Sequence, residues 1–416
     1  MARTARPINP FYTGIKIPYK YFCDRERETD EIIDLLNNGN NVVLKAKRRI
    51  GKSSLIYHIF DHPEVTARYN TLYLDLFGTT CLNDFHVLFQ GKVLGAPFSR
   101  GARVRKDFEN MAKNLSISLG EYNPVTGNYS LPRIGITPSQ MPLIPLDELF
   151  SFLENTKKPN IVVFDEFQQI QYYPERMAAI LRSSIQKMNN TRFVFSGSSS
   201  HMLTEMFNLN TQPFYKSASP FDIRELSLDK YHIFCKSVLE EYGRRISYEA
   251  SRFLYILFSG ETAPMQETMN AVFRNSRPGK EIDVDSIKGA VEILLDQRDN
   301  SYREILSRIE RPNTRNVLYC IAAMGIAGNL TSSKNMHYYR LDSASSVQKS
   351  LIALQDEKSP LIKRLSKGIY VMDDRVFELW IAREGNYLDY KYAAAEERFF
   401  EQMELEYPKF SPTSPA

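Results

Sequence analysis

The sequence contains few cysteines and no long hydrophobic run. Its four cysteines lie far apart, without a C-x-x-C pair, at Cys23, Cys81, Cys235 and Cys320. This spacing argues against a zinc site and a disulfide framework, and it predicts free thiols in a reducing cytoplasm. No window approaches the roughly 18 apolar residues of a membrane span, and the N-terminal "MARTARPINPFYTG" lacks the apolar core of a secretory signal. We therefore expect a cytoplasmic protein with no membrane partner.

A strong excess of charge of one sign is also missing. The 416 residues carry a formal net charge of only +4, which neither demands nor excludes a nucleic-acid partner. Local clusters of charge therefore matter more than the total. With 43% hydrophobic residues the chain can bury a large core, and its length predicts two or three domains.

The stretch "LKAKRRIGKSSL" at 44–55 ends in the Gly-Lys-Ser of a phosphate-binding loop. The usual pattern, G-x-x-x-x-G-K-[ST], has a glycine where this chain has Ala46. An apolar strand at 41–44 and a helix over 52–60 flank the loop, as a phosphate site requires. We expect Lys52 to reach the β- and γ-phosphates and Ser53 to ligate Mg²⁺; the alternative is an ordinary turn rich in Lys and Arg. The predicted nucleotide-binding residues of this stretch are Ala46, Arg49, Ile50, Gly51, Lys52, Ser53 and Ser54.

A second apolar segment, "IVVFDE" at 161–166, ends in two carboxylates. A continuous apolar run is typical of a strand buried on both faces of a parallel sheet, and ligands bind at the carboxyl ends of such strands. There Asp165 would bind nucleotide by holding Mg²⁺ through water, and Glu166 would polarise an attacking water molecule. The alternative is that the two residues merely begin a loop.

Two further strands are expected at 71–77 and at 192–197. Asp75, near the end of the first, is interpreted as structural, orienting water or Thr79. At the tip of the second, "RFVFSG", Ser196 and Ser198 could sense the γ-phosphate, or they could cap the next helix. We assign Ser196 to catalysis, together with Lys52 and Glu166.

Several motifs in this order resemble a known family of ATPases. They are "NPF" at 9–11, "YFCDRERE" at 21–28, "KRRIGKSSL" at 47–55, "VVFDEFQ" at 162–168 and "FSGSSSHM" at 195–202. The set is similar to the AAA+-related archaeal and bacterial ATPase-domain family, relatives of the STAND signalling ATPases, over residues 9–384. Members of that family often have a double-arginine loop without the first glycine, as this chain has Arg48 and Arg49.

The resemblance implies further roles near the nucleotide. It places Arg25 against the adenine and ribose, although the same segment also fits an amphipathic helix with Asp24 as its N-cap. It places a basic residue near the γ-phosphate at Lys216, where a lysine cannot form the planar fork of an arginine finger. At the second-sensor turn the chain has Glu-Thr-Ala-Pro, so no histidine can touch nucleotide there. ATP is preferred to GTP by resemblance, because no N-K-x-D motif occurs in a suitable place.

The C-terminal third predicts a winged helix. Apolar helices at 314–326 and 343–357 precede two strands around Gly368, and this order would place Lys349, Lys363, Arg364 and Lys367 on or near the recognition helix and wing. Such a domain binds DNA or, alternatively, a protein. Residues 376–383 are expected to form a packing helix with the only tryptophan, Trp380, and the final "YPKFSPTSPA" to be disordered.

These predictions combine into one architecture. The fold class is α/β: a P-loop NTPase core with a doubly wound parallel sheet at 1–210, interrupted by an inserted segment at about 95–146 that contains a basic cluster at 99–106 and a hairpin near 123–127. A helical lid follows at 211–300, then a winged-helix domain at 301–392 and a tail at 393–416.

The predicted function is a Mg²⁺-dependent ATPase whose nucleotide state moves the lid and winged helix to control a protein partner. ATP and Mg²⁺ are the expected ligands, DNA is a further partner that the winged helix allows, and formation of a homo-oligomer stays open. The alternative is a nucleotide-gated scaffold or DNA-binding regulator with little turnover. A kinase or transferase fits less well, because the sequence indicates no acceptor pocket.

Overall fold

The computed structural model describes residues 8–96, 122–123, 128–129, 143–356 and 360–406. Within them the chain forms two compact units. The core unit comprises Gly14–Glu225, and the helical unit comprises the residues up to Thr13 together with those from Leu226 onward. The predicted basic cluster at 99–106, most of the inserted segment and the tail from 407 onward lie outside the described residues.

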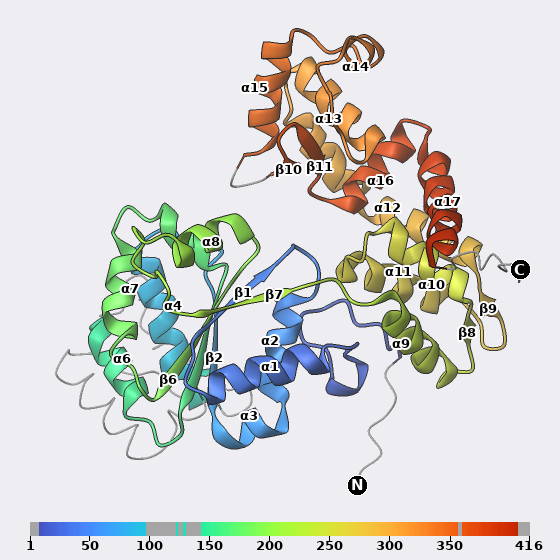
Figure 1. Cartoon of the computed structure of the whole chain (residues 1–416). Coiled ribbons are helices and arrows are strands. Elements are labelled where there is room, and N and C mark those ends of the chain that lie inside the picture. Colours follow the sequence, from blue (N-terminus) through green and yellow to red (C-terminus); the bar gives the residue numbers. More distant parts are fainter. Residues whose placement is uncertain (1–7, 97–121, 124–127, 130–142, 357–359, 407–416) are drawn as a thin grey trace, which may run out of the picture. The chain divides into compact units, whose positions relative to one another are not determined.

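The core unit is built on a five-stranded parallel sheet (Figure 1). The strand order is β2-β5-β6-β1-β7, so that every neighbour is reached by a crossover connection. The strands are β1 (Val42–Ala46), β2 (Asn70–Asp75), β5 (Asn160–Asp165), β6 (Thr191–Gly197) and β7 (Ser219–Ile223).

Helices cover both faces of this sheet, which makes it doubly wound as predicted. One face packs against α1 (Glu26–Asn37), α2 (Lys52–Asp61) and α3 (Pro63–Arg68). The other face packs against α4 (Leu82–Gly95), α6 (Leu146–Glu154), η4 (Phe167–Tyr172), α7 (Met177–Ile185) and α8 (Ser200–Asn208). Period-2 alternation sends Val163 to the first face and Phe164 to the second, and this is why the central strands read as continuous apolar runs.

The boundary expected between core and lid at residue 210 is wrong. Residues 219–223 form β7, which pairs in parallel with β1, and the core unit runs to Glu225. The strand was missed because it is an edge strand with only partly buried residues and with Pro220, which the sheet tolerates at an edge.

The inserted segment is described only in part. Residues Tyr122–Asn123 (β3) and Asn128–Tyr129 (β4) pair antiparallel, which agrees with the predicted hairpin, while the four residues that would form its turn lie outside the described chain.

The helical unit begins with the N-terminal residues, which were predicted to belong to the core. Asn9 donates a hydrogen bond to the Asn270 carbonyl at 3.0 Å, and the Asn270 amide donates to the Phe11 carbonyl at 2.7 Å. The Phe11 ring is fully buried and contacts the rings of Phe234 and Phe273. The first helices of this unit are α9 (Leu228–Glu240), α10 (Tyr248–Leu257), α11 (Thr262–Asn275) and α12 (Val284–Ser307), with the short parallel pair β8 (Arg245–Ile246) and β9 (Glu281–Ile282).

The predicted winged-helix order is present after α12. A short helix that the sequence did not indicate, α14 (Ser333–Tyr338), lies between the two predicted ones, α13 (Pro312–Met324) and α15 (Ala344–Leu354). The wing is the antiparallel pair β10 (Ile362–Ser366) and β11 (Ile369–Met372), with an added bridge between Ala327 and Tyr370. Helices α16 (Arg375–Glu384) and α17 (Leu388–Glu406) follow, so a helix extends into the region predicted as tail. Trp380 is buried in α16, as expected, and its indole N–H donates to Asp299 at 3.0 Å.

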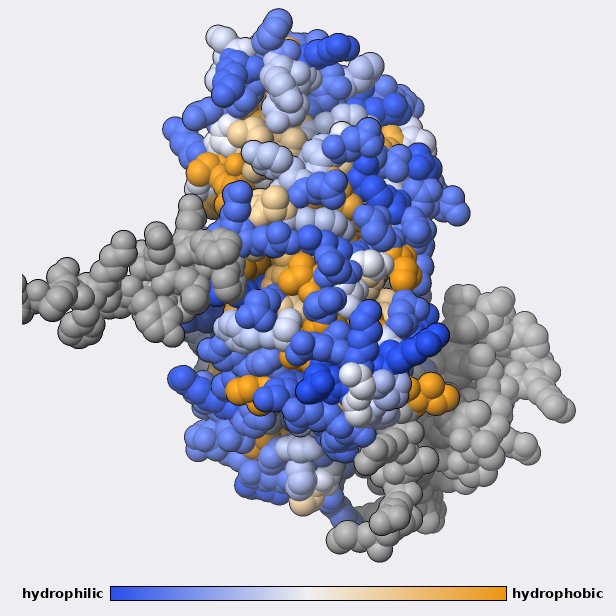
Figure 2. Space-filling view, turned by 90° about the vertical axis from the view of Figure 1, so that its right-hand side faces the viewer, coloured by the Kyte–Doolittle hydropathy of each residue, from blue (hydrophilic) through white to orange (hydrophobic). Residues whose placement is uncertain are grey.

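The surface agrees with the balanced composition. On the face shown in Figure 2, hydrophilic residues predominate and hydrophobic ones occur in small separate groups. In the described part of the chain, none of the helices combines the length and the apolar character needed to cross a membrane.

A buried ionic cluster joins three helices of the winged-helix region. The Lys391 ammonium on α17 donates to the carbonyls of Ala322 and Ala323, at the C-terminal end of α13, at 2.6 and 3.2 Å. It also pairs at 2.8 Å with Glu378 on α16, which Arg375 contacts as well. A cation at this position complements the partial negative charge of the α13 terminus.

We expect Lys391→Met to lower the free energy of unfolding by about 3 kcal/mol, because it removes one partner of a buried carboxylate. The loss should lie at the low end for such pairs, since Arg375 remains beside Glu378. Denaturant titration measures it, with Arg308→Met as the control: Arg308 pairs with Glu304 on the exposed surface of α12 and should cost less than about 1 kcal/mol. Equal losses in the two variants would contradict this assignment.

Candidate active site

The candidate phosphate loop connects β1 to α2, as the sequence predicted. Ala46 is the last residue of β1 and is paired with Ile223, so its backbone is extended and needs no glycine. Arg49 and Gly51 adopt left-handed conformations with φ of 67° and 86°. The chain therefore keeps glycine at the second position of the motif, where a positive φ requires it, and drops it at the first, where the strand does not.

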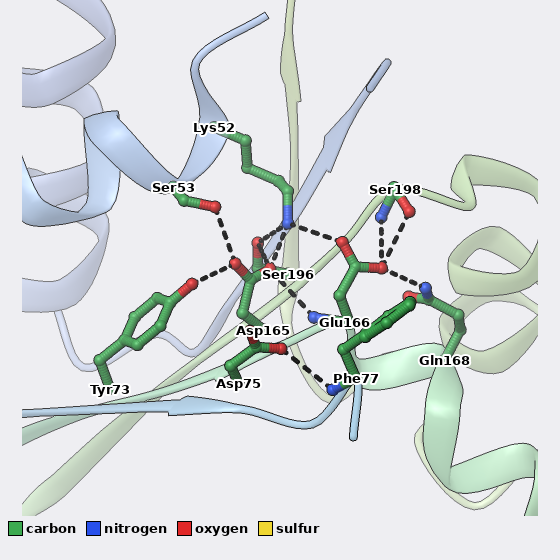
Figure 3. A network of polar contacts seen from close by, with 10 residues as sticks. All are labelled: Lys52, Ser53, Tyr73, Asp75, Phe77, Asp165, Glu166, Gln168, Ser196 and Ser198. Carbon is green, nitrogen blue, oxygen red and sulfur yellow. Dashed lines mark hydrogen bonds and ion pairs between the residues drawn. The ribbon is translucent and has the colours of Figure 1, made fainter. Parts of the chain in front are cut away.

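A buried ion pair lies directly after the loop (Figure 3). The Lys52 ammonium contacts the Asp165 carboxylate from the end of β5 and lies 2.9 Å from the Ser196 hydroxyl on β6. All three side chains are buried. Because β6 lies between β1 and β5 in the sheet, Ser196 stands between the two motif strands, where it was predicted.

Asp165 is the centre of this network. Its Oδ2 atom accepts hydrogen bonds from Ser53 at 2.9 Å and from Tyr73 at 2.5 Å. Its Oδ1 atom accepts from Ser196 at 2.9 Å and from the backbone N–H of Glu166 at 3.0 Å. Burial alone would raise the pKa of Asp165, but the Lys52 charge and the hydrogen bonds outweigh it and hold the pKa below its usual range. Asp165 is therefore ionised at neutral pH.

Glu166 has a different environment from its neighbour. Its left-handed backbone, with φ of 53°, leaves the strand and starts η4. Its Oε2 atom accepts hydrogen bonds from the Ser198 hydroxyl at 2.8 Å and from the Gln168 amide, while its Oε1 atom lies 3.7 Å from the Lys52 ammonium. Of the two predicted sensor residues, Ser198 thus contacts Glu166 and Ser196 contacts Asp165.

Arg25 is joined to the loop, although it was predicted only to lie against a base. Its guanidinium is buried and donates to the Ile50 carbonyl at 3.1 Å and to Glu28 at 2.8 Å. The expected N-cap, Asp24, is off by one residue: α1 starts at Glu26, and Arg25 occupies the cap position with φ of 94°. This left-handed conformation accompanies the inward position of the guanidinium beside the loop.

Four other residues considered in the sequence analysis also lie in the described part of the core unit. They form no hydrogen bond or ion pair with Lys52 or Asp165 there: Ile50, Ser54, Asp75 and Lys216. Ile50 is buried against the apolar face of α1 and α2, and Ser54 lies in the first turn of α2. The Lys216 ammonium lies 5.2 Å from the centre of the Tyr215 ring. Asp75 accepts a hydrogen bond from the Phe77 N–H at 3.0 Å, whereas Thr79 bonds to the Leu76 carbonyl and to Tyr173.

Three residues of the network were not singled out from the sequence. Tyr73 reaches Asp165 from β2, which is the neighbour of β5, and only the strand order reveals this contact. Gln168 holds Glu166, and Gly197 leaves the space for Gln168, because a Cβ at Gly197 would lie 2.0 Å from the Gln168 Oε1 atom.

Comparison with known proteins agrees with this fold. A family model described as "Probable winged helix domain" matches residues 300–383. A search of curated proteins gave no match. Among solved structures, a Walker-type ATPase of Pyrococcus abyssi superposes with a TM-score of 0.61 at 18% identity, covering 89% of this chain and 99% of that one. The ORC2 protein of Aeropyrum pernix, solved in ADPNP and ADP complexes, superposes with a TM-score of 0.51 at 14% identity, covering 92% and 97%.

This chain has the fold of a Walker-type ATPase with a winged helix. The predicted fold class is thus confirmed, as is the resemblance to AAA+-related ATPases at the level of the fold.

Two oxygen donors that suit a hard cation lie together after β1 and at the end of β5. The Ser53 hydroxyl and the Asp165 carboxylate converge to 2.9 Å, and hydroxyl and carboxylate oxygens suit the hard cation Mg²⁺. In the part of the chain that the structure describes, no group of three or more His, Cys, Asp or Glu side chains could hold a metal by itself. The remaining ligands would have to be water and phosphate, as is usual for Mg²⁺.

We expect Gly197→Ala to destabilise the core by about 1 kcal/mol, at the low end for overpacking, because the new methyl group would displace the end of the Gln168 side chain from its hydrogen bond to Glu166. Gly91→Ala is a matched control, since nothing lies within 4 Å of a Cβ at that position in α4. The control should be neutral or up to about 1 kcal/mol more stable, because alanine favours helices. Thermal and denaturant unfolding measure both, and a Gly197→Ala protein as stable as the control would contradict the close packing.

Proposed function

We propose that this protein is a Mg²⁺-dependent ATPase. The observation that carries the proposal is the convergence of Lys52, Ser53 and Ser196 on Asp165, with Glu166 beside it, at the carboxyl ends of three neighbouring strands. Ligands of open α/β sheets bind at that edge. The shared fold supports an ATPase in general, and the residue roles below are part of the proposal.

The loop and the start of α2 would bind the phosphates. Backbone N–H groups at a helix N-terminus favour an anion, and Lys52 is the first residue of α2. The Lys52 side chain would exchange part of its contact with Asp165 for the β- and γ-phosphates. Ser53 and Asp165 would hold Mg²⁺, which supplies positive charge against the charge that develops on the phosphates.

Glu166 would orient and polarise the attacking water. The Ser198 hydroxyl and the Gln168 amide fix its Oε2 atom, and its side chain is about one-fifth exposed, so that water can reach it. A positioned carboxylate of this kind contributes to phosphoryl transfer by orienting the water and by accepting a proton from it.

The proposal extends to a switch that acts on a partner. The helical unit carries the winged helix and is compact in its own right, whereas every residue of the proposed catalytic network belongs to the core unit. Nucleotide-dependent ordering of segments is a general means by which such proteins signal. The identity of a protein partner and the formation of a homo-oligomer stay predictions.

We expect Glu166→Gln to retain ATP binding while phosphate release falls by about 10²–10⁴-fold, because the amide cannot accept a proton. Lys52→Ala should weaken ATP binding itself. Calorimetry measures the binding, and a phosphate-release assay measures the turnover.

Glu205→Gln is the control for charge removal, since Glu205 is partly exposed on α8 and lies 3.7 Å from His201 in a weak ion pair. Equal slow hydrolysis in wild type and Glu166→Gln would favour the low-turnover scaffold. Absence of heat with any adenine nucleotide, unchanged by Lys52→Ala, would end the proposal.

DNA is a second candidate partner because of the charge on the winged helix. Lys349 on α15 and the wing residues Arg364 and Lys367 are exposed, whereas Lys363 is paired with Asp373 at 2.7 Å. A recognition helix and a wing with cations of this kind fit the phosphates of duplex DNA.

We expect duplex DNA to bind the wild-type protein at low salt, and the combined Lys349→Ala, Arg364→Ala and Lys367→Ala variant to lose most of this affinity. The slope of log affinity against log salt should flatten by about 0.9 for each phosphate contact removed. Fluorescence anisotropy measures both quantities, and Lys236→Ala, on the exposed side of α9, is the control. If the triple variant bound DNA as tightly as the wild-type protein, this surface would be excluded as the DNA-binding site.

A further inference from the structure

Tyr73 lies where no phosphate-loop motif placed a residue. It comes from β2, and its hydroxyl donates to the Asp165 Oδ2 atom at 2.5 Å, the same oxygen that accepts the Ser53 hydroxyl at 2.9 Å (Figure 3). In the parallel pair, Asp75 is opposite Asp165 and Tyr73 is opposite Val163. The tyrosine ring therefore spans two residues along the strands to bring its hydroxyl to the carboxylate.

The packing of the ring fixes the position of this hydroxyl. Tyr73 is partly buried on the sheet face that α2 covers, and its ring contacts that of Tyr57 with centroids 4.9 Å apart. Tyr57 lies on α2, the helix that starts with Lys52 and Ser53, and the Lys16 ammonium lies 4.8 Å from its ring centre. The Tyr73–Tyr57 contact thus joins strand β2 to α2, the helix that follows the loop.

The two donors on Oδ2 differ in the elements that carry them. Ser53 is the loop residue whose oxygen suits Mg²⁺, and a hydroxyl ligates a cation through a lone pair while its O–H can still donate to Asp165. The Tyr73 hydroxyl comes from the neighbouring strand and is not part of the loop. Ser53 would therefore follow any movement of the loop on nucleotide binding, whereas Tyr73 holds the carboxylate from a strand of the sheet.

We propose that Tyr73 is a positioning residue that holds the Asp165 carboxylate in the orientation in which Asp165 and Ser53 take Mg²⁺. Residues that bond to a metal-binding carboxylate set its orientation, and their removal typically lowers metal affinity by about 10–100-fold. The inference rests on the proposed function, because it assigns Tyr73 to the same metal site.

A purely structural role of Tyr73 predicts a different result. If Tyr73 only satisfied a buried carboxylate, loss of its hydroxyl would lower the stability of the protein and leave the metal requirement unchanged. The readout must therefore separate metal dependence from folding and from nucleotide affinity as such.

The test compares Tyr73→Phe with Tyr57→Phe and with wild type, all in the full chain. Binding of a fluorescent ATP analogue is measured in EDTA and then at increasing MgCl₂, and melting temperatures are recorded without ligand. For Tyr73→Phe we expect the Mg²⁺ concentration at half effect to rise by about 10–100-fold, with binding in EDTA unchanged. Tyr57→Phe removes a hydroxyl from the adjoining ring and should behave as wild type.

The outcomes separate the two proposals. If wild type shows Mg²⁺-dependent binding and Tyr73→Phe has the same Mg²⁺ requirement, the positioning role is overturned and the ATPase proposal stands. A lower melting temperature with an unchanged Mg²⁺ requirement overturns it equally, in favour of the structural role. If wild type binds no nucleotide at any Mg²⁺ concentration, the ATPase proposal fails and the positioning role falls with it.

Discussion

The buried ion pair between Lys52 and Asp165 is the interaction around which the core unit is arranged. Removing two charges from water costs several kcal/mol per ion, and their mutual attraction offsets this only when hydrogen bonds satisfy the remaining polar atoms. Ser53, Ser196 and Tyr73 supply those bonds from α2, β6 and β2. The hydroxyl groups therefore come from three different elements and meet at one edge of the sheet. The cost of burying the pair is one physical reason why these hydroxyl groups are gathered there.

The adjacent carboxylates of Asp165 and Glu166 differ because the backbone changes direction between them. Asp165 ends a regular strand, and its side chain stays under the loop among buried donors. Glu166 has a positive φ, and its side chain reaches Ser198 and Gln168 at a partly exposed position. A left-handed conformation is costly for a residue with a Cβ and persists only where its surroundings impose it. The Asp165 carboxylate is thus buried and paired, whereas the Glu166 carboxylate one residue later is open to water.

The sequence predicted what depends on local pattern and missed what depends on strand order. β5 and β6 were found because both faces of each are buried, and the wing was found because a glycine with φ of 79° forms its turn at Gly368. β7 was missed because an edge strand carries only half of that pattern. The Tyr73 contact joins residues 92 positions apart, and the Asn9 contact joins residues 261 positions apart. No local sequence pattern indicates that residues so far apart in the chain are in contact, so only the structure reveals these two hydrogen bonds.

The variant loop shows how a motif can lose one glycine and keep its geometry. Ala46 lies within the β1 ladder beside Ile223, and an extended backbone accepts any side chain that fits the core. Gly51 directly precedes α2 and has φ of 86°, a conformation that most residues adopt only under strain. Arg25 adds a second constraint, because its hydrogen bond to the Ile50 carbonyl ties the loop to the segment before α1. The pattern of glycines in such a loop therefore shows where the backbone must turn. The first position of the motif is free to change because here it still belongs to the strand.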